Sequence, residues 1–257
     1  MFADADLSRD GFLGGRLQLW QPLKGYRAAT DPVLLAAACP AEPGQTVLDL
    51  GCGAGTAALC LAARVPGLVL TGLELQPAYA ALARRNAAEN GVTMEVVEGD
   101  LTAMPADLRR GFDHVIANPP YYPRHGSPSP QPDRDLALRA GVALSLWVDA
   151  AARRLSPGGW LTMILGTDAL PQVLAALPPR LGSAALLPLA ARKDRPALRV
   201  ILQARKGGRA AFRLLPPLIL HEGAAHDGDR DTSSPKVAAV LRHGAGICEE
   251  FSRMPRG

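Results

Sequence analysis

The chain has 257 residues, 48 % of them hydrophobic and 20 % charged, which is typical of a globular protein with a substantial core. No apolar run approaches the roughly 18 residues that a membrane span needs, and the opening MFADADLSRD lacks the basic and apolar regions of a secretory signal. The net charge is +4, and neither the four cysteines nor the five histidines have metal-ligand spacing. We therefore expect a cytoplasmic protein with reduced thiols, no membrane association and no metal.

From Thr46 onward, short apolar runs alternate with helical stretches, which predicts a parallel sheet with helices on both faces. The expected strands are 46–51, 68–75, 94–100, 112–118 and, after a turn at 157–159, 160–165; the expected helices are 56–64, 78–90 and 142–155. Residues 184–190 and 197–205 flank a basic ARKDRP segment and predict an antiparallel hairpin. We expect an α/β fold with a seven-stranded, mostly parallel sheet and one antiparallel strand. The single expected domain, 1–257, comprises a lead (1–45), a core (46–205) and a C-terminal extension (206–257).

The segment DLGCGAGT (49–56) follows the first expected strand and opens a helix. Its glycines, Gly51, Gly53 and Gly55, let the backbone turn tightly and approach a ligand, and the helix N-terminus offers free N–H groups. A dinucleotide fingerprint needs GxGxxG, but the spacing here is GxGxG, which makes a pyrophosphate the less suitable ligand. The spacing resembles the first motif of methyltransferases, where this turn cradles the methionine part of S-adenosylmethionine.

Two acidic residues end the next two expected strands of this part of the sheet. Glu74 lies where a carboxylate can accept hydrogen bonds from both ribose hydroxyls, and Asp100 is placed to hold the adenine amine of a cofactor. An NAD enzyme carries an acid at the position of Glu74 too, so this residue indicates a nucleoside without choosing between the two cofactors. Three such features at successive strand ends favour a cofactor site over ordinary surface acids.

The segment ANPPYY (117–122) closes the fourth expected strand, because consecutive prolines cannot continue a central ladder. Pro119 and Pro120 stiffen a turn at the carboxyl edge of the sheet, where open α/β sheets bind ligands. The motif resembles the Asn-Pro-Pro-Tyr signature of methyltransferases acting on planar amino groups. The Asn118 side-chain oxygen and the Pro119 carbonyl would each accept one N–H of the amine, which lets the nitrogen lone pair localise. Tyr121 would stack on the base.

With these motifs, the chain resembles the bacterial methyltransferases that modify N6 of adenine beside the anticodon of a valine tRNA. KGYRAATDPVLLAA (24–37) is similar to the family's Thr-Asp-x-x-Leu-Leu stretch and precedes the other motifs in the family's order. The resemblance implies a Rossmann-like class I methyltransferase fold, S-adenosylmethionine as cofactor, and Thr30 and Asp31 near its methionine end. Thr30 or Asp31 also fits a helix N-cap before Pro32. The expected cofactor residues are Thr30, Asp31, Asp49, Gly51, Gly53, Gly55, Glu74, Asp100 and Asn118.

The expected partner is RNA, most specifically a tRNA methylated at adenosine 37. Residues 180–213 contain nine basic side chains and one acid, which suits a polyanion because each neutralised phosphate releases counterions. Residues 123–135, which follow the Asn-Pro-Pro-Tyr motif, are a candidate substrate-gating loop, and the loop 123–139 offers further arginines to the RNA. The alternative to RNA binding is that both segments form an ordinary solvated basic surface.

Other acceptors use the same catalytic residues. A protein glutamine N5-methyltransferase is the main alternative, although such enzymes usually carry a sizeable helical domain before the glycine motif. Ribosomal RNA adenine is a further alternative. A DNA adenine methyltransferase would need a target-recognition module, and no segment is large enough to form one. A non-catalytic RNA-binding protein is disfavoured by the intact glycine turn, Glu74 and Asn118.

Overall fold

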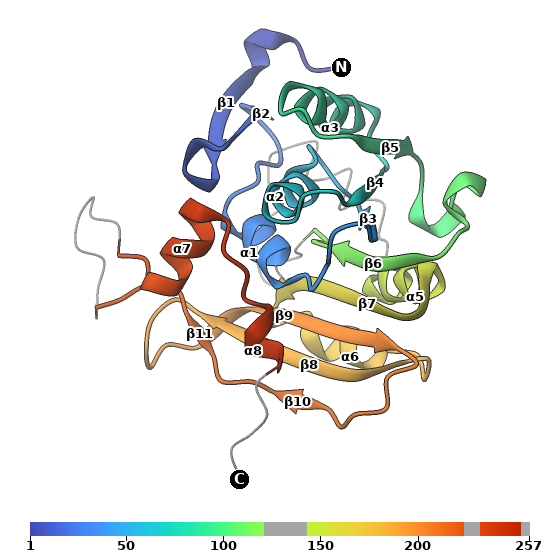
Figure 1. Ribbon diagram of the computed structural model, residues 1–257, viewed down its shortest axis with the longest axis vertical. Helices are drawn as coiled ribbons and strands as arrows, with labels where there is room; N and C mark the ends of the chain where they lie inside the picture. Colours follow the sequence, from blue (N-terminus) through green and yellow to red (C-terminus); the bar gives the residue numbers. More distant parts are fainter. Residues whose placement is uncertain (121–142, 224–231, 253–257) are drawn as a thin grey trace.

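A computed structural model describes residues 1–120, 143–223 and 232–252 of the chain. A central sheet runs through the molecule, with an N-terminal hairpin at one end and the short strand Arg213–Leu214 at the other (Figure 1). The strands are β1 (Leu7–Phe12), β2 (Leu17–Pro22), β3 (Thr46–Leu50), β4 (Val69–Glu74), β5 (Met94–Glu98), β6 (Phe112–Ala117), β7 (Leu155–Gly166), β8 (Leu181–Ala190), β9 (Ala197–Lys206), β10 (Arg213–Leu214) and β11 (Leu218–Ile219). The α-helices are α1 (Thr30–Ala38), α2 (Thr56–Arg64), α3 (Pro77–Glu89), α5 (Leu144–Arg154), α6 (Leu170–Ala175), α7 (Pro235–His243) and α8 (Cys248–Ser252).

The strand order of the central sheet confirms the predicted α/β architecture. The order is β10-β8-β9-β7-β6-β3-β4-β5, and β11 also pairs with β8. β9 runs antiparallel to both of its neighbours, whereas β3 to β7 are mutually parallel. All seven predicted strands are present, including the antiparallel hairpin of β8 and β9. The two short strands at the β8 edge were not predicted.

Alternating apolar side chains divide the sheet between two hydrophobic cores. Val47 and Ile116 pack on the side of α1, α2 and α7, whereas Leu48 and Val115 pack on the side of α5. Because successive strand residues point to opposite faces, continuous apolar runs are required for a sheet buried on both sides. This explains why the core strands could be predicted from unbroken hydrophobic segments of the sequence.

Three local predictions were wrong. Pro157-Gly158-Gly159 lies within β7, which begins at Leu155, so the glycines accommodate an irregular start of a strand rather than a turn before it. α1 begins at Thr30 with Ala29 as its N-cap and no side-chain capping bond, so neither Thr30 nor Asp31 caps the helix. β5 ends at Glu98, before Asp100.

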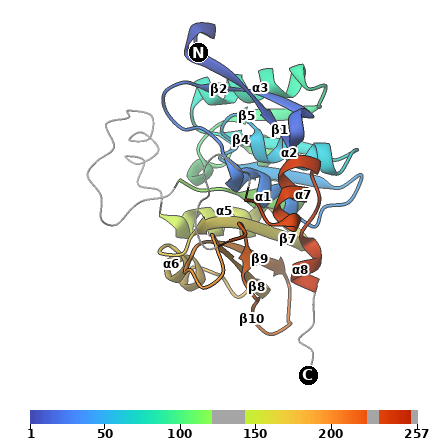
Figure 2. The same ribbon diagram turned by 90° about the vertical axis from the view of Figure 1, so that its left-hand side faces the viewer.

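Residues 7–22 form an antiparallel hairpin that the sequence analysis did not predict. β1 and β2 pair in register from Leu7↔Pro22 to Phe12↔Leu17. The hairpin lies beside α3, at the end of the molecule opposite β10, as the two perpendicular views show (Figures 1 and 2). No helix in the described ranges is long and apolar enough to cross a membrane.

Candidate active site

The site lies where β3, β4 and β6 end at one edge of the sheet, because these parallel strands share a carboxyl edge. The turn after β3 uses left-handed backbone at Gly51 (φ 65°), Gly53 (φ 56°) and Gly55 (φ 83°). Side chains other than hydrogen are strained in this conformation, so the glycines are needed for the turn. Gly55 is the N-cap of α2, and the first N–H groups of that helix therefore face the turn.

Glu74, at the end of β4, holds this turn in place. Its Oε2 accepts a hydrogen bond from the Gly53 N–H at 2.8 Å, and its Oε1 accepts one from the Gln76 N–H at 2.9 Å. Glu74 is only 6 % exposed, and burial raises the pKa of its carboxyl, while the backbone donors partly offset that rise. Each carboxylate oxygen has a second lone pair, so the bonds to the turn leave acceptor capacity for ribose hydroxyls.

Asp49 is a buried carboxyl below the same turn. It is 2 % exposed, and burial raises its pKa to about 8, with a hydrogen bond from the Ala58 N–H opposing the shift and the nearby Glu74 charge adding to it. Within the described part of the chain, Asp49 Oδ2 and the Thr56 hydroxyl have no hydrogen-bond partner. A buried, unpartnered carboxylate oxygen beside a glycine cradle fits a ligand with cationic and N–H groups, such as the methionine part of S-adenosylmethionine.

Asn118 directly follows β6 and contacts a residue of the N-terminal lead. Its Nδ2 donates a hydrogen bond to the Tyr26 hydroxyl at 3.1 Å. Tyr26 also lies over the glycine turn, since a Cβ added at Gly53 would be 3.8 Å from Tyr26 Cε1. Pro119 is buried and Pro120 half-buried beside Asn118. The structure therefore brings Asn118 and the glycine turn together through Tyr26. Tyr121 lies outside the described residues.

The remaining predicted site residues lie around this centre with other partners. Asp31, in the first turn of α1, forms an ion pair with Arg199 of β9 at 3.1 Å. Thr30 is exposed at the start of the same helix. Asp100 accepts a hydrogen bond from the Thr102 N–H at 2.8 Å and caps a short 3-10 helix (Leu101–Ala103). Ligand contacts of these three residues stay predictions.

Sequence reasoning missed four residues that build the site. Trp147 of α5 packs against the turn so closely that a Cβ on Gly51 would be 2.5 Å from its Cη2. Tyr79 of α3 accepts a hydrogen bond from the Tyr26 N–H and donates one to the Tyr26 carbonyl. Tyr26 itself and Asn86 complete the set. Tyr79, Asn86 and Trp147 come from helices outside the motifs, where a single such residue carries no motif signal. Tyr26 lies within the 24–37 stretch, but nothing in that stretch indicates a contact with Asn118.

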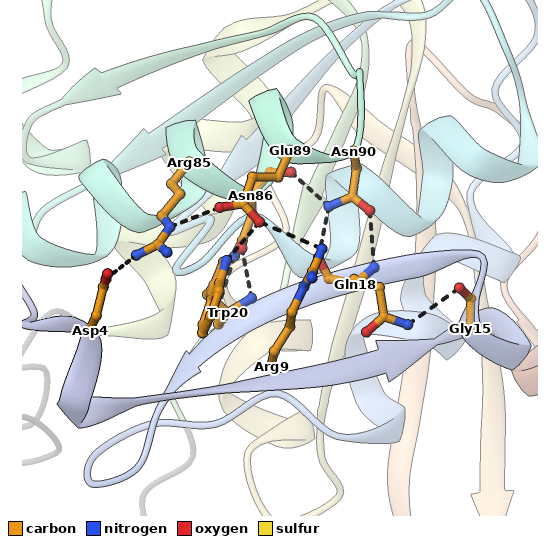
Figure 3. Close-up of polar contacts among 9 residues, drawn as sticks. All are labelled: Asp4, Arg9, Gly15, Gln18, Trp20, Arg85, Asn86, Glu89 and Asn90. Carbon is orange, nitrogen blue, oxygen red and sulfur yellow. Dashed lines mark hydrogen bonds and ion pairs between the residues drawn. The ribbon is translucent and has the colours of Figure 1, made fainter.

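The N-terminal hairpin is held on α3 by two asparagines whose side-chain amides bond to the backbone of β2, as a neighbouring strand would (Figure 3). Asn86 accepts from the Trp20 N–H at 2.7 Å and donates to the Trp20 carbonyl at 3.1 Å. Asn90, one turn later, does the same for Gln18 at 3.0 and 2.9 Å. Asn86 also donates to the Ala54 carbonyl in the glycine turn at 2.9 Å. One buried amide thus joins the hairpin, α3 and the turn.

The basic segment 180–213 does not form one patch. The tip between β8 and β9, with Arg192, Lys193 and Arg195, lies at the carboxyl edge, because Arg199 pairs with Gly166 at the end of β7. Arg205 pairs with Trp160 near the start of β7, so it lies toward the opposite edge. The 10 residues of β8 separate the two groups by about 30 Å.

Several of these basic side chains also have partners within the protein. Arg180 pairs with Asp149 at 2.7 Å, and Arg205 donates to the Gly158 carbonyl and lies over the Trp160 ring. Lys206 donates to the Leu155 carbonyl. The basic residues of the segment 180–213 therefore lie at two separate places, and RNA binding by them stays a prediction. The loop 123–139 lies outside the described residues. Within the described ranges, no cluster of side chains could hold a metal ion.

The strand order, the glycine turn and the acids at the strand ends define a class I, S-adenosylmethionine-dependent methyltransferase. The chain belongs to the methyltransferase small domain family, whose model matches residues 29–173. The family resemblance inferred from the sequence and the predicted cofactor are thereby confirmed.

The curated relatives differ in the acceptor that their names give. A release factor glutamine methyltransferase of Geobacter sulfurreducens is 35 % identical over 157 residues, covering 58 % of this chain and 55 % of the relative. A tRNA1(Val) (adenine(37)-N6)-methyltransferase of Shewanella sp. (strain MR-4) is 31 % identical, covering 60 % of this chain and 66 % of the relative. The chain thus spans about half the length of the glutamine methyltransferases that it matches.

A solved structure, described as a predicted O-methyltransferase of Agrobacterium tumefaciens, has the same fold over almost its full length. The TM-score is 0.69 at 28 % identity, and the match covers 84 % of this chain and 98 % of that one. The two chains therefore share the fold over most of the length of each.

Proposed function

We propose that the protein methylates N6 of adenine in RNA, and more specifically adenosine 37 of a tRNA, with S-adenosylmethionine as methyl donor. The observation that carries this proposal is the position of Asn118-Pro119 at the carboxyl end of β6, beside the glycine turn and bonded to Tyr26. A planar amine bound there would meet two acceptors, the Asn118 side-chain oxygen and the Pro119 carbonyl, next to the expected methionine end of the cofactor.

Within this proposal, Asp49 and the glycine turn hold the methionine part of the cofactor, Glu74 the ribose and Asp100 the adenine amine. The cofactor supplies an electrophilic methyl group on a sulfonium. Asn118 Oδ1 and the Pro119 carbonyl each accept one N–H of the acceptor amine, which aligns the nitrogen and localises its lone pair. The nitrogen becomes cationic on methylation and then loses its proton, so no strong general base is needed.

RNA is favoured over a protein as the acceptor by charge. The tip residues Arg192, Lys193 and Arg195 lie at the same edge of the sheet as Asn118, where they would meet the phosphates of an RNA whose base enters the site. Arg192 also donates to the backbone of Glu222 and Gly223, which ties the tip to the segment that follows β11.

Glutamine N5-methylation is the second candidate, because the glutamine methyltransferase match reaches 35 % identity against 31 % for the tRNA enzyme. An amide also presents a planar NH₂ group to Asn118 and Pro119. Ribosomal RNA adenine is a third acceptor with the same chemistry.

The test follows transfer of labelled methyl groups from S-adenosylmethionine to unmodified tRNA, ribosomal RNA and a glutamine-bearing release factor, with nucleosides and peptides identified by mass spectrometry. We expect N6-methyladenosine in tRNA from the wild-type protein, none from Asn118→Ala, and wild-type product from the control Gln172→Ala, which removes an exposed carboxamide on α6, outside the site. Label confined to the release factor, with none in RNA, would replace the proposal by glutamine methylation.

A further inference from the structure

Tyr26 is a residue of the N-terminal lead that contacts the site. It follows β2 and lies at the junction of three features: the glycine turn, Asn118 and Tyr79. Although 43 % of the residue is exposed, its hydroxyl accepts the hydrogen bond from Asn118 Nδ2. The contact links chain positions 92 residues apart, so only the folded lead can supply it.

The position of Tyr26 is fixed by α3. Its backbone N–H donates to the Tyr79 hydroxyl at 3.0 Å, and that hydroxyl donates to the Tyr26 carbonyl at 3.2 Å. Tyr79 is buried, and the edge of its ring system packs with Phe2 at a centroid distance of 5.2 Å. A residue held by both backbone groups has little freedom, so its hydroxyl occupies a defined place relative to the end of β6.

We propose that Tyr26 is a positioning residue for methyl transfer, whose hydroxyl fixes the Asn118 amide with its nitrogen toward the lead and its oxygen toward the acceptor amine. The inference rests on the proposed role of Asn118. In a planar carboxamide the oxygen and nitrogen diverge from one carbon, so a bond that anchors Nδ2 also sets the direction of Oδ1. The opposite orientation would aim N–H donors at the N–H groups of the acceptor.

The state of the Tyr26 hydroxyl supports this role. Burial of its hydroxyl end, together with the nearby carboxylates of Asp31 and Asp49, raises the pKa of Tyr26 well above its usual value. The hydroxyl therefore stays protonated over the neutral range, and it accepts from Asn118 as a neutral group. The hydrogen bond from the Asn118 amide to Tyr26 therefore does not change with pH over the neutral range.

The test compares Tyr26→Phe with a matched control, Trp20→Phe. Both variants remove one polar hydrogen-bonding group from the lead, but Trp20 Nε1 bonds to Glu89 on α3, away from Asn118. We expect Tyr26→Phe to lower kcat between about 10- and 100-fold, the range that loss of one hydrogen bond and a small misplacement of a reacting group produce. The Kd for S-adenosylhomocysteine and the urea midpoint should stay near the wild-type values. Trp20→Phe should leave kcat unchanged.

A second measurement needs no acceptor and separates this inference from the proposed function. In ¹⁵N-labelled protein, the Asn118 side-chain amide signal is identified by its loss in Asn118→Ala. We expect this signal to shift, and its protons to exchange faster, in Tyr26→Phe but not in Trp20→Phe. An unchanged amide signal overturns the inference whatever the acceptor is, and so does a changed signal with unchanged kcat on the acceptor identified. Absence of RNA methylation by the wild type overturns only the RNA proposal.

Discussion

Alanine at Gly51 should damage the fold more than alanine at any glycine with the same backbone angle and open surroundings. Gly51 has φ +65°, and a Cβ there would lie 2.5 Å from Trp147 Cη2 and 3.0 Å from Cζ3. Gly91, in the turn after α3, has the same φ of +65° with no atom within 4 Å of a built Cβ. The pair therefore separates backbone strain from the clash with the tryptophan ring.

The expected magnitudes follow from these two terms. An L-residue in the left-handed region costs about 1–2 kcal/mol, which is the whole expected loss for Gly91→Ala. Forcing extra volume against a packed ring costs about 1–3 kcal/mol more. Gly51→Ala should therefore lower the free energy of unfolding by about 2–5 kcal/mol. Because the glycine turn must move away from α5, affinity for S-adenosylmethionine should fall as well.

Urea unfolding of both variants gives the two costs, and calorimetric titration with S-adenosylmethionine gives the affinity. A Trp147→Phe background supplies the decisive comparison, because the shorter ring of phenylalanine withdraws the atoms nearest to Gly51. In that background the cost of Gly51→Ala should fall to the cost of Gly91→Ala. Equal costs for the two glycines in the wild-type background would refute the assigned role of Trp147.

Three further predictions concern the lead, the buried carboxyl and the basic tip. Asn86→Ala should lower the free energy of unfolding by about 1–3 kcal/mol and remove amide-exchange protection from β2, because this fully buried side chain satisfies the backbone of Trp20 and Ala54. The raised pKa of Asp49, about 8, means that the ligand-free fold loses stability as pH rises from about 4 toward 8, and that binding a cation there releases a proton. Affinity for S-adenosylmethionine should then increase between about pH 6 and pH 8, a trend that Asp49→Asn should abolish in titrations. Charge reversal at Lys193 and Arg195 should weaken tRNA binding and reduce its salt dependence in filter-binding assays. Charge reversal at Arg209 and Arg213, the matched control, should have a far smaller effect on both.

The parallel core was predictable because its signals are local. Thr46–Leu50 is an apolar run that continues directly into three glycines and a helix, so strand, turn and helix are contiguous in sequence. The acids and prolines that end β4 and β6 are likewise adjacent to the runs that they terminate. Even the antiparallel hairpin of β8 and β9 needed only two neighbouring apolar segments and a polar connection.

The N-terminal hairpin was not predictable in the same way, because its stabilising partners are remote. Trp20 and Gln18 find their backbone partners in Asn86 and Asn90, 66 and 72 residues away. The sequence does not indicate that an asparagine in a helix will bond to the backbone of a strand far away in the chain. The role of Tyr26 depends on that docking, so it was hidden for the same reason.

The basic segment illustrates a different limit. Nine positive residues within 34 positions suggested one surface, yet a hairpin with strands of 10 residues carries its two ends to opposite edges of the sheet. Charge density along a sequence translates into a patch only where the chain turns back within a few residues. The chain turns back in this way between Ala190 and Ala197, so the basic residues of the tip stay close together in the folded protein.

α3 is the element on which the separate parts of the site depend. Tyr79 fixes the residue that contacts Asn118, and Asn86 bonds both the hairpin and the Ala54 carbonyl of the glycine turn. The glycine turn and Asn118 are therefore tied to one helix through side chains rather than through adjacent strands. It follows that a change in α3 that loosens the lead should impair both cofactor binding and the positioning of the acceptor. Loss of the Tyr26 hydroxyl alone should impair only the positioning of the acceptor.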